Sequence, residues 1–339
     1  MGSLTAIRMR LTLLAVALAA GGTLWGLSRA ERRTLHHVPI LMYHKIGDGS
    51  DSPWWVTAAD FEAHLQSLKE QGYRSVFPSD LVAHRTWGWP LPAKPVIITF
   101  DDGYLNTVTG AEPLLRKYGF RAVCYLITGQ ISDTPDTRRS CEGAPMLSWP
   151  EVRAAQRRGT LRFGGHTRSH ANLMAMNDPR GEVEACYRDI RKQGGFKPEG
   201  FCYPFGQLKP GTPPVVAKAG FTTAVTCDDG VAATTPELDL LKLPRVAIMG
   251  GRHVYHVERL PATNALTLRV WKEGHAMQTR PRLKSTTPHG DVDAWLPSVT
   301  IDSHPTTLSW PFPSATPPAS PVLEFWDDFQ VLMLARQSL

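Results

Sequence analysis

The sequence predicts an irregular α/β barrel, with a doubly wound open sheet as the alternative architecture. Between Val38 and Met249, short apolar runs alternate with segments of helical periodicity. This alternation implies parallel strands joined by right-handed crossovers. The chain has 339 residues, of which 42% are hydrophobic and 20% are charged, so it is long enough to bury a large core.

Seven short apolar runs are the expected strands of this fold. Their lengths are those of buried strands, and the second is led by proline and rich in β-branched residues. In chain order the runs are Val38–Tyr43, Val96–Phe100, Ala122–Ile127, Leu161–Gly164, Phe201–Tyr203, Phe221–Thr226 and Val246–Met249.

Cap residues mark the ends of the expected helices. Thr57 opens one helix, with Asp60 three residues later as its capping-box partner. Ser148 opens another, which ends at Gly159. A further helix ends near Gly119, and residues 179–193 read as a charged amphipathic helix.

The sequence changes character after about residue 260. Residues 281–321 contain nine prolines, and because proline cannot donate to a strand ladder we expect this stretch to lie outside any central sheet. Leu266–Val270 alternates like a strand, and 322–334 is apolar and aromatic. We therefore expect a main domain over 35–260 and a small β-rich or irregular extension over 261–339.

Residues 1–34 have the pattern of an export signal or a membrane anchor. Two arginines precede the apolar stretch 11–27, and three arginines follow it. Ala17-Leu18-Ala19 resembles a cleavage site, which predicts a removable signal peptide. The apolar run continues beyond that point and approaches the length that spans a bilayer, so an uncleaved anchor is equally compatible, and a buried core helix is a third reading. Either of the first two predicts an exported protein, either secreted or attached to a membrane and facing outward.

Charge and cysteine usage exclude two classes of site. The net charge is +6, but residues 1–34 hold five arginines and one glutamate, or +4, which leaves +2 for the other 305 residues. Without a basic stripe, nucleic acid is not expected as a partner. None of the five cysteines forms a C-x-x-C pair, which argues against a zinc–thiolate site. An exported chain has room for one or two disulfides, and the odd count leaves a thiol unpaired.

Two adjacent carboxylates, Asp101 and Asp102, directly follow the expected strand 96–100 and precede Gly103. In a parallel α/β fold this places both acids at the carboxyl end of the sheet, where active sites form. One carboxylate can bind a cation while the other stays free as a base. The alternative is an Asp pair at the start of a helix, followed by a turn glycine.

Two histidines, His166 and His170, follow the expected strand 161–164 and so should lie at the same end of the fold. Two imidazoles and one carboxylate suit Zn²⁺ or another first-row divalent metal, with positions left for water. Surface histidines would explain the spacing alone, but its occurrence together with the Asp-Asp-Gly motif favours a metal site.

Together these motifs resemble those of the NodB-homology polysaccharide deacetylases, carbohydrate esterase family 4, over roughly residues 38–250. The resemblance implies a distorted (β/α)7 barrel. It implies that Asp101 is the catalytic base, and that Asp102, His166 and His170 bind one divalent metal ion, zinc being the first choice. Tyr203-Pro204-Phe205-Gly206 resembles the family's third motif, which lines the substrate groove and offers a backbone amide to the oxyanion.

The chain departs from the family pattern at three places. Cys202 stands where an arginine usually tethers the base, and Phe205 stands where tyrosine is usual. The usual fifth motif, with its catalytic histidine, is absent near Leu243-Pro244-Arg245, and we place Arg245 with the substrate and oxyanion residues. Leu41-Met42-Tyr43-His44 resembles a branch that includes exported poly-N-acetylglucosamine deacetylases, in which His44 matches the catalytic acid.

The implied reaction is metal-assisted hydrolysis of acetyl groups, most simply N-acetyl, on a carbohydrate polymer. The metal would polarise the acetyl carbonyl, Asp101 would take a proton from water, and His44 would protonate the leaving group. We expect a monomer whose partner is an acetylated polysaccharide. The alternatives are a catalytically inactive, membrane-tethered carbohydrate-binding module, a deacetylase of O-acetylated xylan, or another amide hydrolase on the same scaffold.

Overall fold

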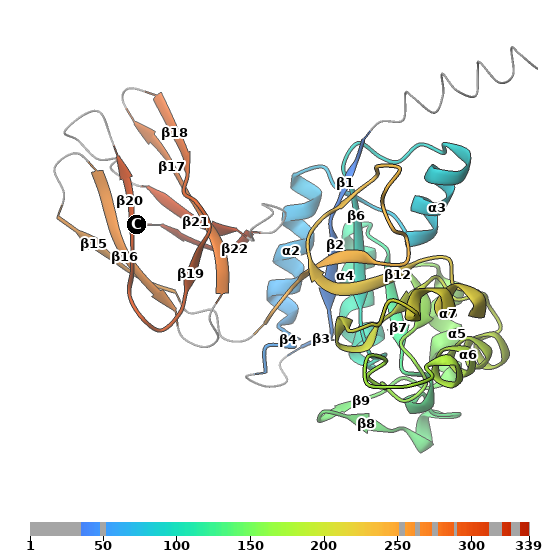
Figure 1. Ribbon diagram of the computed structural model, residues 1–339. Helices are drawn as coiled ribbons and strands as arrows, with labels where there is room; N and C mark the ends of the chain where they lie inside the picture. The colour runs from blue at the N-terminus through green and yellow to red at the C-terminus, as the bar shows by residue number, and fades with distance from the viewer. Residues whose placement is uncertain are drawn as a thin grey trace, which may run out of the picture.

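Seven parallel strands close into a barrel (Figure 1). The computed structural model describes residues 35–47, 52–250, 255–261, 265–272, 277–287, 290–311, 321–326 and 333–338. The strands follow one another round the barrel in the order β2-β14-β12-β11-β10-β7-β6, and pairing of β2 with β6 closes it. The predicted barrel is confirmed, and the open sheet is wrong. The strands are β2 (Ile40–Tyr43), β6 (Pro95–Phe100), β7 (Ala122–Leu126), β10 (Leu161–Gly165), β11 (Phe201–Cys202), β12 (Ala224–Asp229) and β14 (Leu243–Ala247).

Alternate residues of each strand face either the barrel interior or the surrounding helices. Ile97 packs with apolar residues from five other barrel strands, so its side of β6 is the interior. Its neighbours Val96 and Ile98 belong to the larger core beneath the helices. Because side chains alternate along a strand, Thr99 and Asp101 continue the interior row towards the carboxyl end of β6.

The helices begin and end at the predicted cap residues. Thr57 Oγ1 accepts a hydrogen bond from the Asp60 amide at 3.0 Å, and Ser148 forms a capping box with Glu151. Gly119 and Gly159 end their helices with positive φ. The helices are α2 (Ala58–Glu70), α3 (Pro78–Trp87), α4 (Glu112–Tyr118), α5 (Trp149–Arg158), α6 (Arg180–Asp189), which continues as a π-helical turn over Ile190–Gly194, and α7 (Thr212–Ala219).

The last two barrel strands differ in position from the prediction. β12 begins at Ala224, because Phe221 follows the helix-ending Gly220 and packs its ring against Tyr187. β14 begins at Leu243 and includes Pro244. Proline fits there because the register between β12 and β14 shifts at this point and a ladder hydrogen bond is already interrupted.

Short paired segments complete both ends of the barrel. At the end where the strands begin, β1 (His37–Val38) pairs with β13 (Ala232–Ala233), and β5 (Arg74–Ser75) pairs with the start of β6. At the other end, β3 (Lys45–Ile46) pairs with β4 (Trp55–Val56), and β8 (Ser140–Cys141) forms a hairpin with β9 (Ala144–Pro145).

The C-terminal strands form two antiparallel sheets that share an apolar core. One sheet contains β15 (Tyr255–Leu260), β16 (Ala265–Lys272) and β20 (Thr306–Pro311). The other contains β17 (Met277–Thr287), β18 (Gly290–Trp295), β19 (Val299–Ile301), β21 (Val322–Trp326) and β22 (Met333–Ser338). Leu268 of the first sheet and Leu283 of the second belong to one buried cluster. Since β15 pairs with β16, residues 255–260 are hydrogen-bonded to the C-terminal strands; the division into 35–260 and 261–339 stays a prediction.

One expectation for this region is wrong, because Pro281 lies inside β17, which pairs on both sides. The Pro281 carbonyl accepts a hydrogen bond from the Leu296 amide at 2.9 Å. In a strand, the nitrogen and the carbonyl of one residue point to the same side. The Pro281 nitrogen, which has no hydrogen to donate, therefore faces Leu296, at the junction between β18 and β19. No ladder bond is lost there.

The predicted signal or anchor over residues 1–34 lies outside the described residues. Within the part of the chain that the structure describes, no helix has the length and apolar character needed to cross a membrane. All five cysteines lie in that part, and all are free thiols.

Candidate active site

The predicted metal ligands and base meet at the carboxyl end of the barrel strands. Asp101 and Asp102 follow β6, and His166 and His170 follow β10. Asp101 and Asp102 are 2% and 6% exposed, so both carboxylates are buried.

Backbone strain is concentrated at this end of the barrel. Five non-glycine residues in the described chain have φ in the left-handed region, and four of them, Asp102, Thr167, His170 and Phe205, lie in the loops that carry the site. This conformation is unfavourable for residues with a Cβ, and such strain is typical of functional sites. Gly206 is also left-handed, and a Cβ there would lie 2.5 Å from the Cys227 backbone nitrogen, so only glycine fits.

Asp102, His166 and His170 present three donor atoms to one point. Asp102 Oδ1 lies 3.5 Å from His166 Nε2 and 3.7 Å from His170 Nε2, and the three ligand atoms are all within 4.8 Å of one another. The Nδ1 of His166 donates to the Cys202 carbonyl at 2.8 Å, which leaves the Nε2 lone pair directed at the shared point. This donor set fits a divalent cation of the zinc type.

The protonation states of these ligands also suit a cation. Burial lowers the pKa of His166 to about 3 and lowers the pKa of His170, so both imidazoles are neutral at neutral pH. Burial and the neighbouring Asp101 charge raise the pKa of Asp102 to about 7. A buried carboxylate beside a second negative charge favours a positive group, and a divalent cation would supply it.

Asp101 is held by Arg245 from β14. Arg245 Nη1 donates to Asp101 Oδ1 and Nη2 donates to Oδ2, each at 2.8 Å, and Arg245 Nε donates to the Thr226 carbonyl at 2.7 Å. Burial acts to raise the pKa of Asp101, but the Arg245 guanidinium outweighs it and holds that pKa well below its usual range. Asp101 is therefore an ionised carboxylate fixed in one orientation.

This geometry corrects the predicted place of Arg245. Its side chain is fully buried behind Asp101 and does not face a substrate groove or an oxyanion. Cys202, at the position where the family motif has arginine, lies 3.3 Å from Arg245 Nη2. The arginine that the motif would place at residue 202 is thus replaced by Arg245 of β14, which holds Asp101.

His44 follows β2 and lies beside Asp101. Its Nε2 is 4.0 Å from Asp101 Oδ2, and its ring packs against Trp54 with centroids 4.5 Å apart. Burial lowers the pKa of His44 to about 4, so the imidazole is neutral in the resting site. Of the competing histidines, His256 stacks on Trp271 in the C-terminal sheets, and His253 lies outside the described residues.

The third motif is only partly at the mouth of the barrel. Tyr203 is fully buried, and its hydroxyl donates to the Leu241 carbonyl at 3.0 Å, so the expectation that its side chain lines the groove is wrong. Cys202 faces the barrel interior, and the next side chain must therefore face outward. Pro204 is buried, whereas Phe205 is 57% exposed with its ring 4.7 Å from that of His170.

Three residues that the sequence analysis did not single out brace the loop after Asp102. Buried Lys45 donates to Glu142 Oε2 at 2.8 Å, and the Tyr104 hydroxyl donates to the same oxygen at 3.4 Å. Lys45 Nζ also lies 4.6 Å from the centre of the Tyr104 ring. Glu142 and Gly143 both have positive φ, as in the two-residue turns of tight hairpins, and this Glu-Gly pair was the one local signal of the β8–β9 hairpin.

Comparison with known proteins gives one consistent result. Residues 89–224 match the family model for polysaccharide deacetylases. A putative polysaccharide deacetylase of Bacillus subtilis, YxkH, is 27% identical over 62% of this chain and 71% of its own length. A poly-beta-1,6-N-acetyl-D-glucosamine N-deacetylase of Staphylococcus aureus is 23% identical over 60% of this chain and 71% of its own length.

A solved structure agrees with these relatives. The Streptococcus pyogenes deacetylase PplD, in complex with acetate, is 25% identical and superposes with a TM-score of 0.56 over 64% of this chain and 94% of that one. The residues that match the family model, 89–224, include β6, β7, β10 and β11 together with Asp101, Asp102, His166 and His170. Over residues 89–224 the chain therefore matches the polysaccharide deacetylases, and the names of its relatives support a deacetylase-type hydrolase.

Proposed function

We propose that this protein removes N-acetyl groups from a polymer of N-acetylglucosamine with the help of one divalent cation. The family supports deacetylation of a polysaccharide. The choice of polymer is supported by the Staphylococcus aureus relative and by an Escherichia coli relative of the same printed name, 26% identical over 53% of this chain and 32% of that protein.

The proposal depends mainly on one observation. The ionised carboxylate of Asp101 is held in a fixed orientation beside a separate set of three possible metal ligands. Arg245 directs both oxygens of Asp101, while Asp102, His166 and His170 converge on another point. A binding module without catalytic activity has no need for a tethered base beside a cation site. The geometry therefore favours hydrolysis over the inactive-module alternative.

In the proposed reaction the residues divide the work as follows. A cation bound by Asp102, His166 and His170 supplies Lewis acidity towards the acetyl carbonyl and towards water. Asp101 accepts a proton from the attacking water, and Arg245 keeps that carboxylate ionised and oriented beforehand. His44 donates a proton to the leaving nitrogen. Since His44 is neutral in the resting site, it must gain that proton during the reaction, and Asp101 is 4.0 Å away.

We further propose zinc as the cation, because two imidazoles and a carboxylate suit it, although other first-row divalent metals have the same preference. Residues 1–34 would export the chain and, if uncleaved, hold it on a membrane. A single chain would be the functional unit, since one barrel contributes every residue of the site.

Acetate release from purified glycans tests the proposal. Poly-N-acetylglucosamine, peptidoglycan and O-acetylated xylan should be compared with and without a chelator, followed by added zinc. We expect release from poly-N-acetylglucosamine, loss with the chelator and recovery with zinc. His166→Ala should abolish both activity and metal content, while His304→Ala, at an exposed histidine, should change neither. Release from xylan alone, or release that a chelator leaves intact, would contradict the proposal.

A further inference from the structure

An exposed aromatic patch lies at the end of the barrel opposite the active site. Six large hydrophobic side chains are exposed among the described residues, and three of them, Leu35, Trp87 and Trp89, belong to this end. Trp87 and Trp89 are 64% and 61% exposed, with ring centroids 5.5 Å apart. Two adjacent exposed indole rings form an apolar surface of the kind that is typical of an interaction site.

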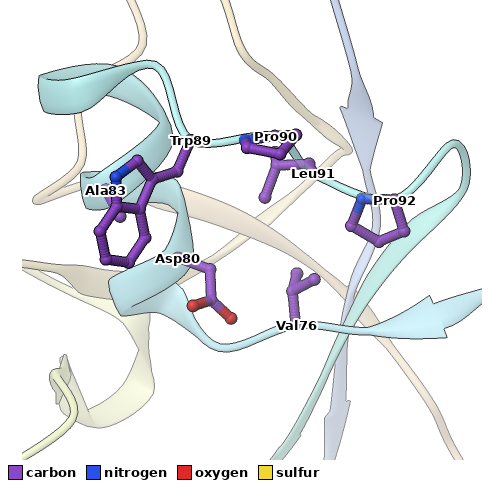
Figure 2. A pocket seen from close by; sticks show the side chains of 7 residues that line it. All are labelled: Val76, Asp80, Ala83, Trp89, Pro90, Leu91 and Pro92. Atoms are coloured by element: carbon purple, nitrogen blue, oxygen red, sulfur yellow. The ribbon is translucent and has the colours of Figure 1, made fainter.

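The patch is held in a defined conformation. Gly88 ends α3 with φ of 69°, and the Nδ1 of His84 donates to the Trp89 carbonyl at 2.7 Å. Trp89 lines a pocket of about 210 Å³ together with Val76, Asp80, Ala83, Leu91 and two prolines (Figure 2). Because the loop is already ordered, docking the two rings on a surface loses little conformational entropy.

The patch lies beside the point where the N-terminal segment joins the barrel. The rings of His36 and His84 are in contact, with centroids 5.6 Å apart. In Figure 1, α3 and the start of β1 lie on the same side of the barrel, while the β8–β9 hairpin lies at the opposite end. The six residues of β6 separate the Trp89 loop from Asp101, a distance of about 20 Å at roughly 3.3 Å per residue.

The sequence before Leu35 identifies the surface that this patch faces. The apolar stretch 11–27 ends eight residues before Leu35, and eight residues span less than about 30 Å even when fully extended. Arg29, Arg32 and Arg33 lie within those eight residues and would attract anionic lipid headgroups. A membrane that held residues 11–27 would therefore lie close to this end of the barrel.

We propose that Trp87 and Trp89 insert into the headgroup–acyl boundary of the bilayer that holds the N-terminal segment. This inference rests on the proposed attachment of residues 1–34 to a membrane. Tryptophan is favoured at this boundary because its ring is apolar while its N–H still reaches polar partners. Docked in this way, the barrel stands with its catalytic end about 20 Å further from the membrane, directed towards an extracellular polymer.

Quenching of tryptophan fluorescence by brominated lipids tests the proposal on the full chain. The protein is reconstituted into vesicles of phosphatidylethanolamine and phosphatidylglycerol, with bromine near the headgroup end of the acyl chain, near its methyl end, or absent. Trp25→Phe first removes the tryptophan of the apolar stretch itself. Trp87→Phe and Trp89→Phe are then added to that chain, since phenylalanine keeps the apolar surface and removes the reporter. Trp295→Phe, at a tryptophan of β18, is the matched control.

The Trp25→Phe chain should be quenched, more strongly by bromine near the headgroups than by bromine near the methyl ends. Adding Trp87→Phe and Trp89→Phe should abolish that quenching, whereas adding Trp295→Phe should retain it. Equal quenching with and without Trp87 and Trp89, or failure of the chain to associate with vesicles, would overturn the proposal.

Two further measurements separate this inference from the other conclusions. If N-acetylglucosamine oligosaccharides, added without vesicles, change the emission of Trp87 and Trp89 while lipids do not, the patch is a carbohydrate site and the membrane proposal fails. Acetate release from the same vesicles tests the proposed activity separately. Its absence would refute the proposed reaction and leave the quenching result intact.

Discussion

Replacing Arg245 by methionine should reveal how strongly the barrel depends on one buried ion pair. Arg245 and Asp101 have side chains that are 0% and 3% exposed, and two hydrogen bonds of 2.8 Å join them. Methionine keeps much of the side-chain volume but leaves the Asp101 carboxylate buried without its partner. Removing one partner of such a pair destabilises a protein by about 3–5 kcal/mol.

The magnitude should depend on the charge of Asp101, which gives the prediction two internal checks. Adding Asp101→Asn to Arg245→Met removes the unpaired charge and should recover most of the lost stability. The deficit should also shrink as the pH falls. In the wild type the depressed pKa of Asp101 contributes stability that is present above its unfolded value, near 4, and is lost at lower pH. In the Arg245→Met protein, the stabilising contribution of the ion pair is absent at every pH. Protonation of Asp101 at low pH also removes the unpaired buried charge, so the difference from the wild type becomes smaller.

Urea unfolding monitored by tryptophan fluorescence, at pH 7 and near pH 4, measures these differences. The matched control is Arg180→Met, which breaks a pair with Asp178 whose side chains are 63% and 52% exposed and should change stability far less, because solvent screens an exposed ion pair. If Arg245→Met is no more destabilising than Arg180→Met, or if Asp101→Asn fails to rescue it, the ion pair does not have the role assigned here.

Three further predictions concern the proposed chemistry. Asp101→Asn should keep the metal and lose about 10²–10⁴-fold in turnover; loss of metal together with activity would show that Asp101 is a ligand. His44→Ala should slow turnover and leave metal content unchanged, because it removes the proposed acid and no metal ligand; unchanged turnover would assign the acid to another group. At pH values below the pKa of Asp102, about 7, a cation must displace one proton from this carboxyl group in order to bind. With increasing pH, cation affinity should therefore rise about tenfold per pH unit up to that pKa and level off above it. Calorimetric titration at several pH values would contradict this if the affinity did not change.

The residues that the sequence could identify are those whose position follows from their place on one strand. Asp101 and Asp102 directly follow β6, and His166 and His170 directly follow β10. In a parallel fold, strand ends of this kind must share one edge, so local motifs are enough to bring the four residues together. His44 after β2 was placed at the mouth by the same reasoning.

The residues that the sequence could not identify make contacts between distant parts of the chain. Arg245 lies 144 residues from Asp101, and Glu142 lies 97 residues from Lys45. No periodicity or spacing links such pairs. No local pattern indicates the register shift between β12 and β14 either, because it depends on how the barrel closes. Tyr203 was misplaced for a simpler reason, because the inward direction of Cys202 was not known.

The substitution at Cys202 therefore has a different meaning in the folded chain than in the motif. The interior of a closed barrel is narrow, so a long side chain from β14 can reach a carboxylate at the end of β6. A tether needs only to supply two donors and a positive charge, and more than one strand can provide them. Three ligands around a cation are more constrained, since each must approach from its own direction. This chain lacks the arginine of the motif, yet Arg245 holds both oxygens of Asp101 from another strand. The cysteine at position 202 is therefore no argument for an inactive site.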